Sequence, residues 1–467
     1  MPPFHFQSIA EVAEQLRVRR LSPVELTEHM LTRISEVDGR LRSYATVMEA
    51  HARAQAAEAE REIAAGRYRG PLHGVPIAVK DLCFTRGVPT MGGTSVLRDH
   101  IPSFDGTAVT RLGAAGAVLL GKLNLTEGAM GGYNPEFPVP ENPWREAHWP
   151  GASSSGSGAA AAAGTAFGTL GSDTGGSIRH PAAACGTVGL KPTWGLVSRY
   201  GVLDLAQSLD HVGPLTRTVQ DAAWMLQAIA GSDEHDPTTL RGAVPDLTAD
   251  INAGVQGLRV GWDERYASED LKDDFASAVE QGIRVLERLG ARIVPVRMPV
   301  RLREYLEAWQ VLCTCEAYDA HRAFFPSRAA EYGPWFREWL EHGAAYTGAD
   351  YARAHHLRLA CARELDDALR HVDLLGCPST AGEAYPMPLE TAYGPIPAGR
   401  DPWTSRFTVP MDYAGLPTLS MPCGLSNNGL PLSLQLVGPA LSEPLLVRAG
   451  HAFESATQWH TLRPPGW

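Results

Sequence analysis

The chain has 467 residues, 44% of them hydrophobic and 20% charged, so it is long enough to bury a large core without covalent staples. Its net charge of −11 argues against a surface that neutralises nucleic-acid phosphates or anionic lipids, and we expect no nucleic-acid or membrane partner. The seven cysteines include no C-x-x-C pair, which predicts reduced core residues in a cytoplasmic protein.

The first 70 residues have the pattern of helices that cover a core formed later in the chain. Ser8 and Glu11 form a capping box ahead of one helix. Ser22 caps a second helix, with Pro23 at its first position, and a third is expected over 46–64. No basic stretch followed by an apolar one opens the chain, so no signal peptide is expected.

From residue 72 onward, short apolar runs alternate with helical patterns. The first run, 75–79, has the pattern of a buried strand that ends at Lys80. Further strands are expected at 116–124, 258–262, 291–296, 372–378, 417–424 and 431–438. Helices are expected at 107–115, 219–230, 272–289, 302–323, 355–370 and 442–457. The alternation predicts an α/β fold: a single large domain over 1–467, with a mixed, mostly parallel sheet wrapped by helices.

A stretch rich in serine, glycine and alanine, 151–181, interrupts this pattern. A P-loop is excluded because no glycine is followed by Lys and then Ser or Thr in the required frame. The stretch also lacks the G-x-S-x-G of the α/β-hydrolase elbow, and no apolar strand precedes it as a dinucleotide site requires. The alternative without a function is a flexible linker. An alanine-rich helix and a segment that returns to the core follow at once, which argues against a linker.

A serine in this stretch needs a base, and no histidine motif supplies one. Lysine can act as the base if burial lowers its pKa, and Lys80 ends a buried strand where such a shift is expected. The adjacent glycines Gly175 and Gly176 allow successive backbone N–H groups to converge on one point, as an oxyanion hole requires.

With these residues in view, the chain resembles the amidase signature family over nearly its whole length. The resemblance rests on the segments "GVPIAVKD", "PGASSSGSGAAAAAG" and "GSDTGGSIRHPAAACGTVGLKPTWGLVSRYG". It implies a Ser–cis-Ser–Lys triad with Ser177 as nucleophile, Ser153 as the bridging serine and Lys80 as base. The N–H groups that the resemblance places in the oxyanion hole are those of Thr174, Gly175, Gly176 and Ser177.

The resemblance also implies a cis peptide bond between Ala152 and Ser153, although the family often has glycine where this chain has Ala152. Around the triad, we expect Ser154 and Ser155 either to support Lys80 or to cap the following helix. Asp173 and Arg179 are expected to pair and to orient the loop that carries the nucleophile. His180 follows that loop and has no required role in the mechanism, and a contact with the substrate is the alternative that stays open for it.

By the same resemblance, 71–230 forms the core of the signature and 300–350 is a helical segment near the substrate pocket. Met130, Gly131 and Tyr133 are expected to border that pocket. The many aromatic residues of 305–346 have the pattern either of a helical core or of a roomy aryl pocket.

We therefore expect a hydrolase of C–N bonds, without metal or cofactor, that acts as monomer or homodimer. Its expected substrate is the amide, anilide or carbamate of a bulky apolar or aryl small molecule, cleaved through an acyl-enzyme on Ser177. Two alternatives within the family remain open. One is the A subunit of a tRNA-dependent amidotransferase, and the other is a cyclic-oligoamide hydrolase.

Overall fold

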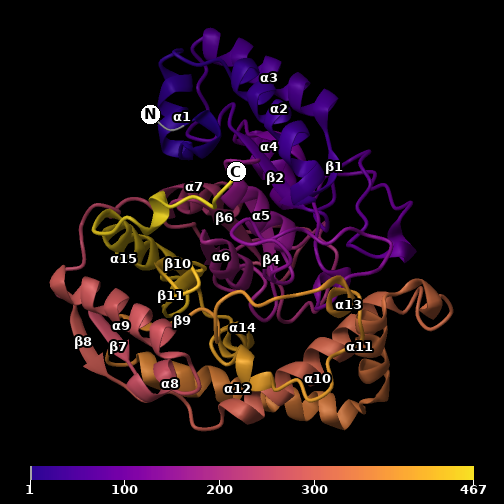
Figure 1. Ribbon diagram of the computed structural model, residues 1–467, viewed down its shortest axis with the longest axis vertical. Coiled ribbons are helices and arrows are strands. Elements are labelled where there is room, and N and C mark those ends of the chain that lie inside the picture. Colours follow the sequence, from indigo (N-terminus) through magenta and orange to yellow (C-terminus); the bar gives the residue numbers. More distant parts are fainter. Residues whose placement is uncertain (1–2) are drawn as a thin grey trace.

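An eleven-stranded sheet runs through the middle of the computed structural model, which describes residues 3–467 (Figure 1). Its strand order is β1-β3-β2-β4-β6-β5-β10-β11-β9-β7-β8. The expected α/β class, the single large domain and the mixed sheet are confirmed. The first two residues of the expected N-terminal segment 1–70 lie outside the described residues.

The strands are β1 Tyr44–Val47, β2 Pro76–Lys80, β3 Val118–Leu123, β4 Gly168–Asp173, β5 Val188–Lys191, β6 His211–Thr216, β7 Arg259–Trp262, β8 Arg292–Pro295, β9 Leu374–Pro378, β10 Thr418–Leu425 and β11 Pro431–Val437. All seven strands expected from the sequence are present within a few residues of their predicted bounds. β1, β4, β5 and β6 were not predicted.

The helices are α1 Ile9–Arg17, α2 Pro23–Leu41, α3 Glu49–Ala64, α4 Thr107–Ala114, α5 Ser155–Ala163, α6 Arg179–Cys185, α7 Val219–Ile229, α8 Glu264–Ser268, α9 Asp273–Arg288, α10 Leu302–His321, α11 Pro334–Ala345, α12 Gly348–Leu369, α13 Leu389–Ala392, α14 Val409–Ala414 and α15 Glu443–Ser455. The Ser8 capping box is present, and the Ser22 hydroxyl accepts from the N–H groups that open α2.

The expectation of a mostly parallel sheet is wrong. Of the ten strand pairings in residues 3–467, four are parallel and six are antiparallel. Parallel neighbours need a crossover, usually a helix, whereas antiparallel neighbours need only a loop. β10 and β11 are joined by the short turn 426–430, and no α-helix lies between β5 and β6. These antiparallel strands occupy the middle of the sheet.

Parallel pairing is retained where β2 lies between β3 and β4. All residues of these three strands are buried. Their carboxyl ends therefore meet at one edge of the sheet, the place where α/β proteins commonly bind ligands. Lys80, the loop after β3 and the loop after β4 all lie at this edge.

The helices cover the sheet in groups that Figure 1 separates clearly. The N-terminal helices α1–α3 lie together at the end near β1, while α10, α11 and α12 form a helical layer at the opposite side of the molecule. The segment between β9 and α14 passes between this layer and the central strands. Among the described residues, no helix combines the length and the apolar character needed to cross a lipid bilayer.

Candidate active site

Lys80 is the last residue of β2 and is fully buried. Its Nζ donates to Ser153 Oγ at 2.7 Å and to Ser172 Oγ at 2.9 Å. Burial lowers the pKa of Lys80 to about 7, because desolvation disfavours the ammonium form. The neighbouring carboxylates of Asp173 and Asp210 oppose this shift without cancelling it. A substantial fraction of Lys80 is therefore neutral near pH 7 and able to accept a proton.

Ser153 lies at the expected cis peptide bond, Ala152–Ser153, just ahead of α5. Its side chain is buried, and its carbonyl accepts from the N–H of Thr126 in the loop after β3 at 3.2 Å. The structure thus holds the Ser153 hydroxyl against Lys80 from a segment 73 positions away in the sequence.

The second partner of Lys80, Ser172, was not identified from the sequence. It lies on β4, which pairs with β2 in parallel, so its side chain reaches the Lys80 ammonium. The Ser154 hydroxyl bonds to the backbone of Ser172 at 3.2 and 3.3 Å and does not contact Lys80. Ser154 is the N-cap residue of α5, yet its side chain caps no N–H. The buried Ser155 hydroxyl interacts with the Tyr133 side chain, and within residues 3–467 it makes no hydrogen bond to Lys80.

Ser177 lies in the loop between β4 and α6 and is half-buried. Together with Thr174 and Gly175 it lines a cavity of about 470 Å³. Among the described residues, no hydrogen bond joins the Ser177 hydroxyl to Ser153. Catalytic hydrogen bonds are often long in a structure without substrate and shorten in the complex.

Three backbone N–H groups of the loop are free to bind an oxyanion. Within 3–467, the N–H groups of Thr174, Gly175 and Ser177 make no hydrogen bond. The Gly176 N–H, in contrast, donates to the Asp173 carboxylate, and Gly176 does not line the cavity. The Asp173 side chain thus engages the Gly176 N–H in this structure, and the place of Gly176 in the oxyanion hole stays a prediction.

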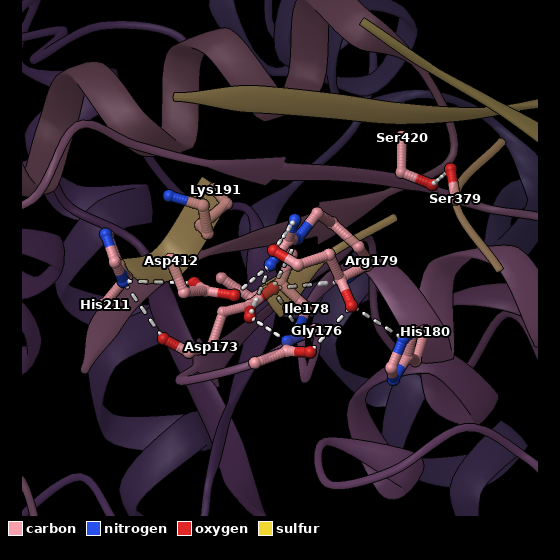
Figure 2. Close-up of polar contacts among 12 residues, drawn as sticks. Asp173, Gly176, Ile178, Arg179, His180, Lys191, His211, Ser379, Asp412 and Ser420 are labelled. Carbon is pink, nitrogen blue, oxygen red and sulfur yellow. Dashed lines mark hydrogen bonds and ion pairs between the residues drawn. The ribbon is translucent and has the colours of Figure 1, made fainter. Parts of the chain in front are cut away.

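The expected pairing of Asp173 with Arg179 is present and belongs to a larger buried network (Figure 2). Arg179 donates from Nε and Nη2 to the two Asp173 oxygens, each at 3.0 Å, and its Nη2 also contacts Asp412. His211 Nδ1 lies 3.4 Å from Asp412 Oδ1 and 3.1 Å from the Asp173 carbonyl. Arg179 holds the pKa of Asp173 well below its usual range despite burial. Asp173 thus stays ionised while it accepts from the loop.

Asp173 fixes the loop directly. Besides Gly176, the N–H of Ile178 donates to its carboxylate at 3.0 Å. The Arg179 guanidinium is in turn fixed by Gln435 Oε1 at 3.0 Å and by the Thr408 carbonyl at 3.1 Å. The central strand β11 and the start of α14 therefore hold the shape of the loop that carries Ser177.

Thr174 is held on the other side of the loop. Its hydroxyl donates to Asp210 Oδ1 at 2.6 Å, and its carbonyl accepts from Trp309 Nε1 on α10 at 2.8 Å. Asp210 also accepts from the N–H groups of Leu205 and Ala206 at 2.9 and 3.0 Å. Burial raises the pKa of Asp210 to about 7.

Met130, Gly131 and Tyr133 line the cavity, as expected for the pocket. Of the aromatic residues of 305–346, only Trp309 and Trp335 line it, and most of the others pack in the core. A Cβ on Gly131 or Gly175 would lie 2.7 or 2.5 Å from one of these two indoles. Glycine at these positions lets an indole pack directly on the backbone.

Apart from His180, the remaining wall was not predicted from the sequence. Trp149 and His180 contribute to it, and so does the segment between β9 and α14. From this segment the lining residues are Thr380, Ala381, Gly382, Glu383, Tyr385, Met387, Thr391, Ala392, Pro397, Arg400, Thr404 and Ser405. In residues 3–467, no group of three or more histidine, cysteine, aspartate or glutamate side chains is arranged to hold a metal ion.

Comparison with known proteins links this site to a large family. The family profile described as Amidase matches residues 25–447. A protein named "Putative amidase AmiD" from Mycobacterium tuberculosis is 44% identical over 98% of this chain and 95% of its own. The A subunit of the glutamyl-tRNA(Gln) amidotransferase from Trichlorobacter lovleyi is 41% identical over 98% of each chain. The structure of a bacterial aryl acylamidase of the amidase signature family superposes with a TM-score of 0.89 at 26% identity, over 98% of each chain.

Proposed function

Because this chain belongs to the amidase signature family, we propose that it is a serine amidase that hydrolyses the C–N bond of a bulky apolar or aryl amide, anilide or carbamate. The observation that carries the proposal is the buried hydrogen bond from Lys80 to Ser153, beside the cavity that Ser177 lines. A lysine whose pKa is about 7 supplies the base that a serine hydroxyl needs.

In this mechanism, Ser177 Oγ forms a bond to the substrate carbonyl carbon. Its proton moves to Ser153 Oγ, and the Ser153 proton moves to neutral Lys80 Nζ. The relay then runs in reverse: the C–N bond breaks, the amine leaves with a proton from Ser153, and an acyl-enzyme remains on Ser177. Water, deprotonated through the same relay, adds to the acyl carbon and releases the acid and the free serine.

The negative charge on the carbonyl oxygen develops beside the free N–H groups of Thr174, Gly175 and Ser177. Donors fixed in advance stabilise such charge without reorganising, and loss of one typically costs about 10²–10³ in kcat. The hydrogen bonds of Asp173 and Thr174 supply that rigidity.

The walls of the cavity support an aryl or bulky apolar substrate. Trp149, Trp309, Trp335 and Tyr385 line it, and aromatic side chains bind flat apolar groups well. The similarity to an aryl acylamidase structure agrees with this preference.

We propose that the chain acts alone, in the cytoplasm, as a monomer or homodimer and without a nucleic-acid substrate. The second candidate, an amidotransferase A subunit, is favoured by the 41% identity to such a protein. It would require partner subunits and would release ammonia from glutamine. The third candidate is a cyclic-oligoamide hydrolase, which would act on a cyclic amide in preference to open-chain ones.

The test is hydrolysis by the purified chain of an aryl anilide, a long-chain alkyl amide, a small aliphatic amide, an aryl carbamate, a cyclic oligoamide and glutamine. Ser177→Ala is run beside the wild type. Fastest turnover of the anilide or carbamate, lost in the variant, would support the proposal. Turnover of glutamine alone would favour the second candidate, an amidotransferase A subunit. Unchanged turnover in Ser177→Ala would refute the role of Ser177 as nucleophile. Size-exclusion chromatography with light scattering tests the oligomeric state.

A further inference from the structure

Arg400 is an exposed cation on the wall of the cavity, and its side chain has no hydrogen-bond or ion-pair partner among the described residues. It lies on the wall formed by the segment between β9 and α14. Within residues 3–467 its guanidinium makes no hydrogen bond and no ion pair, and its contact is the ring of Trp335, 5.7 Å from the ring centroid. A cation–π contact with an indole favours one orientation of an arginine while its N–H donors stay available.

The surroundings of Arg400 explain why no acid pairs with it. The adjacent Asp401 is engaged elsewhere, by Arg303 on α10 at 2.9 Å and by the N–H of Trp403 at 3.0 Å. The other charged residue of the cavity wall, Glu383, pairs with Lys272 at 3.0 Å and accepts from Asn428 at 2.8 Å. Both carboxylates are therefore committed to other partners.

The histidine of the cavity wall, His180, adds no charge to the cavity at neutral pH. Burial lowers the pKa of His180 to about 4, and Arg400 itself contributes to the shift. At neutral pH His180 is uncharged, so among the described residues that line the cavity Arg400 carries the one uncompensated charge. The chain has 52 acidic and 41 basic residues, so an excess of cations does not explain an unpaired arginine on the wall of this cavity.

We propose that Arg400 determines specificity by binding a carboxylate of the substrate, so that the preferred substrates are aryl amides or anilides that carry an acidic group. The inference rests on the proposed function and names the substrate class of the same site. A guanidinium matches a carboxylate in a two-pronged hydrogen-bonded pair, and the aromatic wall receives the ring that bears it.

The kinetic test uses three matched substrates: benzanilide, its 4-carboxylate on the acyl ring, and its 4-carboxylate on the anilide ring. We expect one of the acids to exceed benzanilide in kcat/KM by at least about tenfold, which corresponds to about 1.4 kcal/mol. Arg400→Gln is expected to remove that excess, so that kcat/KM falls much more for the preferred acid than for benzanilide, whereas Arg400→Lys retains part of the excess. Arg322→Gln removes an exposed arginine outside the cavity wall and controls for the change in net charge.

Two results would overturn the proposal: no preference for either acid in the wild type, or an equal loss for all three substrates in Arg400→Gln. A binding measurement separates this failure from failure of the proposed function. Benzoate and benzyl alcohol are titrated into Ser177→Ala and into Ser177→Ala/Arg400→Gln, with tryptophan fluorescence as readout. In Ser177→Ala, we expect benzoate to bind at least about tenfold more tightly than benzyl alcohol, and its affinity to fall as the salt concentration rises. In the double variant, the two compounds should bind with similar affinity. If no amide, anilide or carbamate of the two substrate sets is hydrolysed, the proposed function fails, while the benzoate titration still decides the role of Arg400.

Discussion

Lys80 and Ser153 are 73 positions apart in the sequence, yet Lys80 Nζ lies 2.7 Å from Ser153 Oγ in a fully buried contact. One is the end of a buried parallel strand, and the other precedes a helix of small residues. The contact joins a base of lowered pKa to a hydroxyl that reaches no bulk water. Proton transfer between them therefore depends on the protonation state of the lysine.

The first prediction concerns the pH dependence of activity. Catalysis needs neutral Lys80, so kcat/KM is expected to rise with pH through an apparent pKa near 7 and then to level off. Lys80→Ala should lower kcat/KM by at least about 10³-fold, the scale of losing one member of a catalytic triad. Initial rates between pH 5 and 9 on the fastest substrate provide the measurement. A profile that is flat between pH 6 and 8 would count against Lys80 as the base.

The second prediction tests whether the rise of activity with pH reports the titration of Lys80. Asp210 is the other candidate, because burial raises its pKa to about 7 as well. Ser172→Ala removes an acceptor that lies 2.9 Å from the Lys80 ammonium. Loss of a hydrogen bond to the charged form lowers the pKa of Lys80 further, so the limb is expected to move to lower pH.

Ser157→Ala is the matched control, because this buried serine bonds to the Leu170 carbonyl and not to Lys80. Its pH profile should coincide with that of the wild type. If Ser172→Ala leaves the limb in place, the limb belongs to another group.

The sequence predicted the strands that are built from aliphatic runs, such as β2 and β3, and the helices that have clear caps. It did not reveal β4 and β6, whose residues include glycines and, in β6, a proline. These strands are fixed by their neighbours and not by intrinsic propensity. Glycine within β4 serves packing: a Cβ on Gly168 or Gly171 would lie 2.2 or 2.8 Å from the side chain of Met225 or Ser154.

The same limit applied to the site. Lys80, Ser153 and Ser177 lie in motifs with recognisable residue patterns, so they were identified from the sequence. Ser172 was missed because its role depends on the pairing of β4 beside β2. Arg400 was missed because it lies on a loop far away in the sequence that folds back to line the cavity. Neither carries a local signal.

The third prediction concerns the anchoring of Thr174. Thr174→Val keeps the shape of the side chain but removes the 2.6 Å hydrogen bond to Asp210. Leaving a buried acceptor without this donor should lower the free energy of unfolding by about 1–3 kcal/mol. We also expect kcat to fall more than KM changes, because the same residue lines the cavity beside Ser177 and its N–H is proposed to bind the oxyanion. Urea unfolding and steady-state kinetics provide the two readouts.

Thr187→Val is the control for Thr174→Val. Thr187 is equally buried, but its hydroxyl has no hydrogen-bond partner within the described residues 3–467. Replacing such a hydroxyl with a methyl group should leave stability and kcat unchanged or slightly improved. Equal effects of the two substitutions would show that Asp210 does not anchor the loop.

The fourth prediction concerns the backbone conformation of Gly176. Its φ of +135° lies in a region that favours glycine, and a Cβ there would lie 2.4 Å from the His180 ring. Gly176→Ala is expected to displace the loop that carries Ser177, and a shift of about 1 Å in a reacting group costs about 10²-fold in rate.

Gly39→Ala, in α2 with open space around the added methyl group, is the control: it should keep full activity and gain about 0.5–1 kcal/mol in stability. Circular dichroism verifies that both variants fold, and kcat/KM measures the difference. A Gly176→Ala enzyme with wild-type kcat/KM would mean that the loop tolerates the side chain and that its conformation is not needed for catalysis.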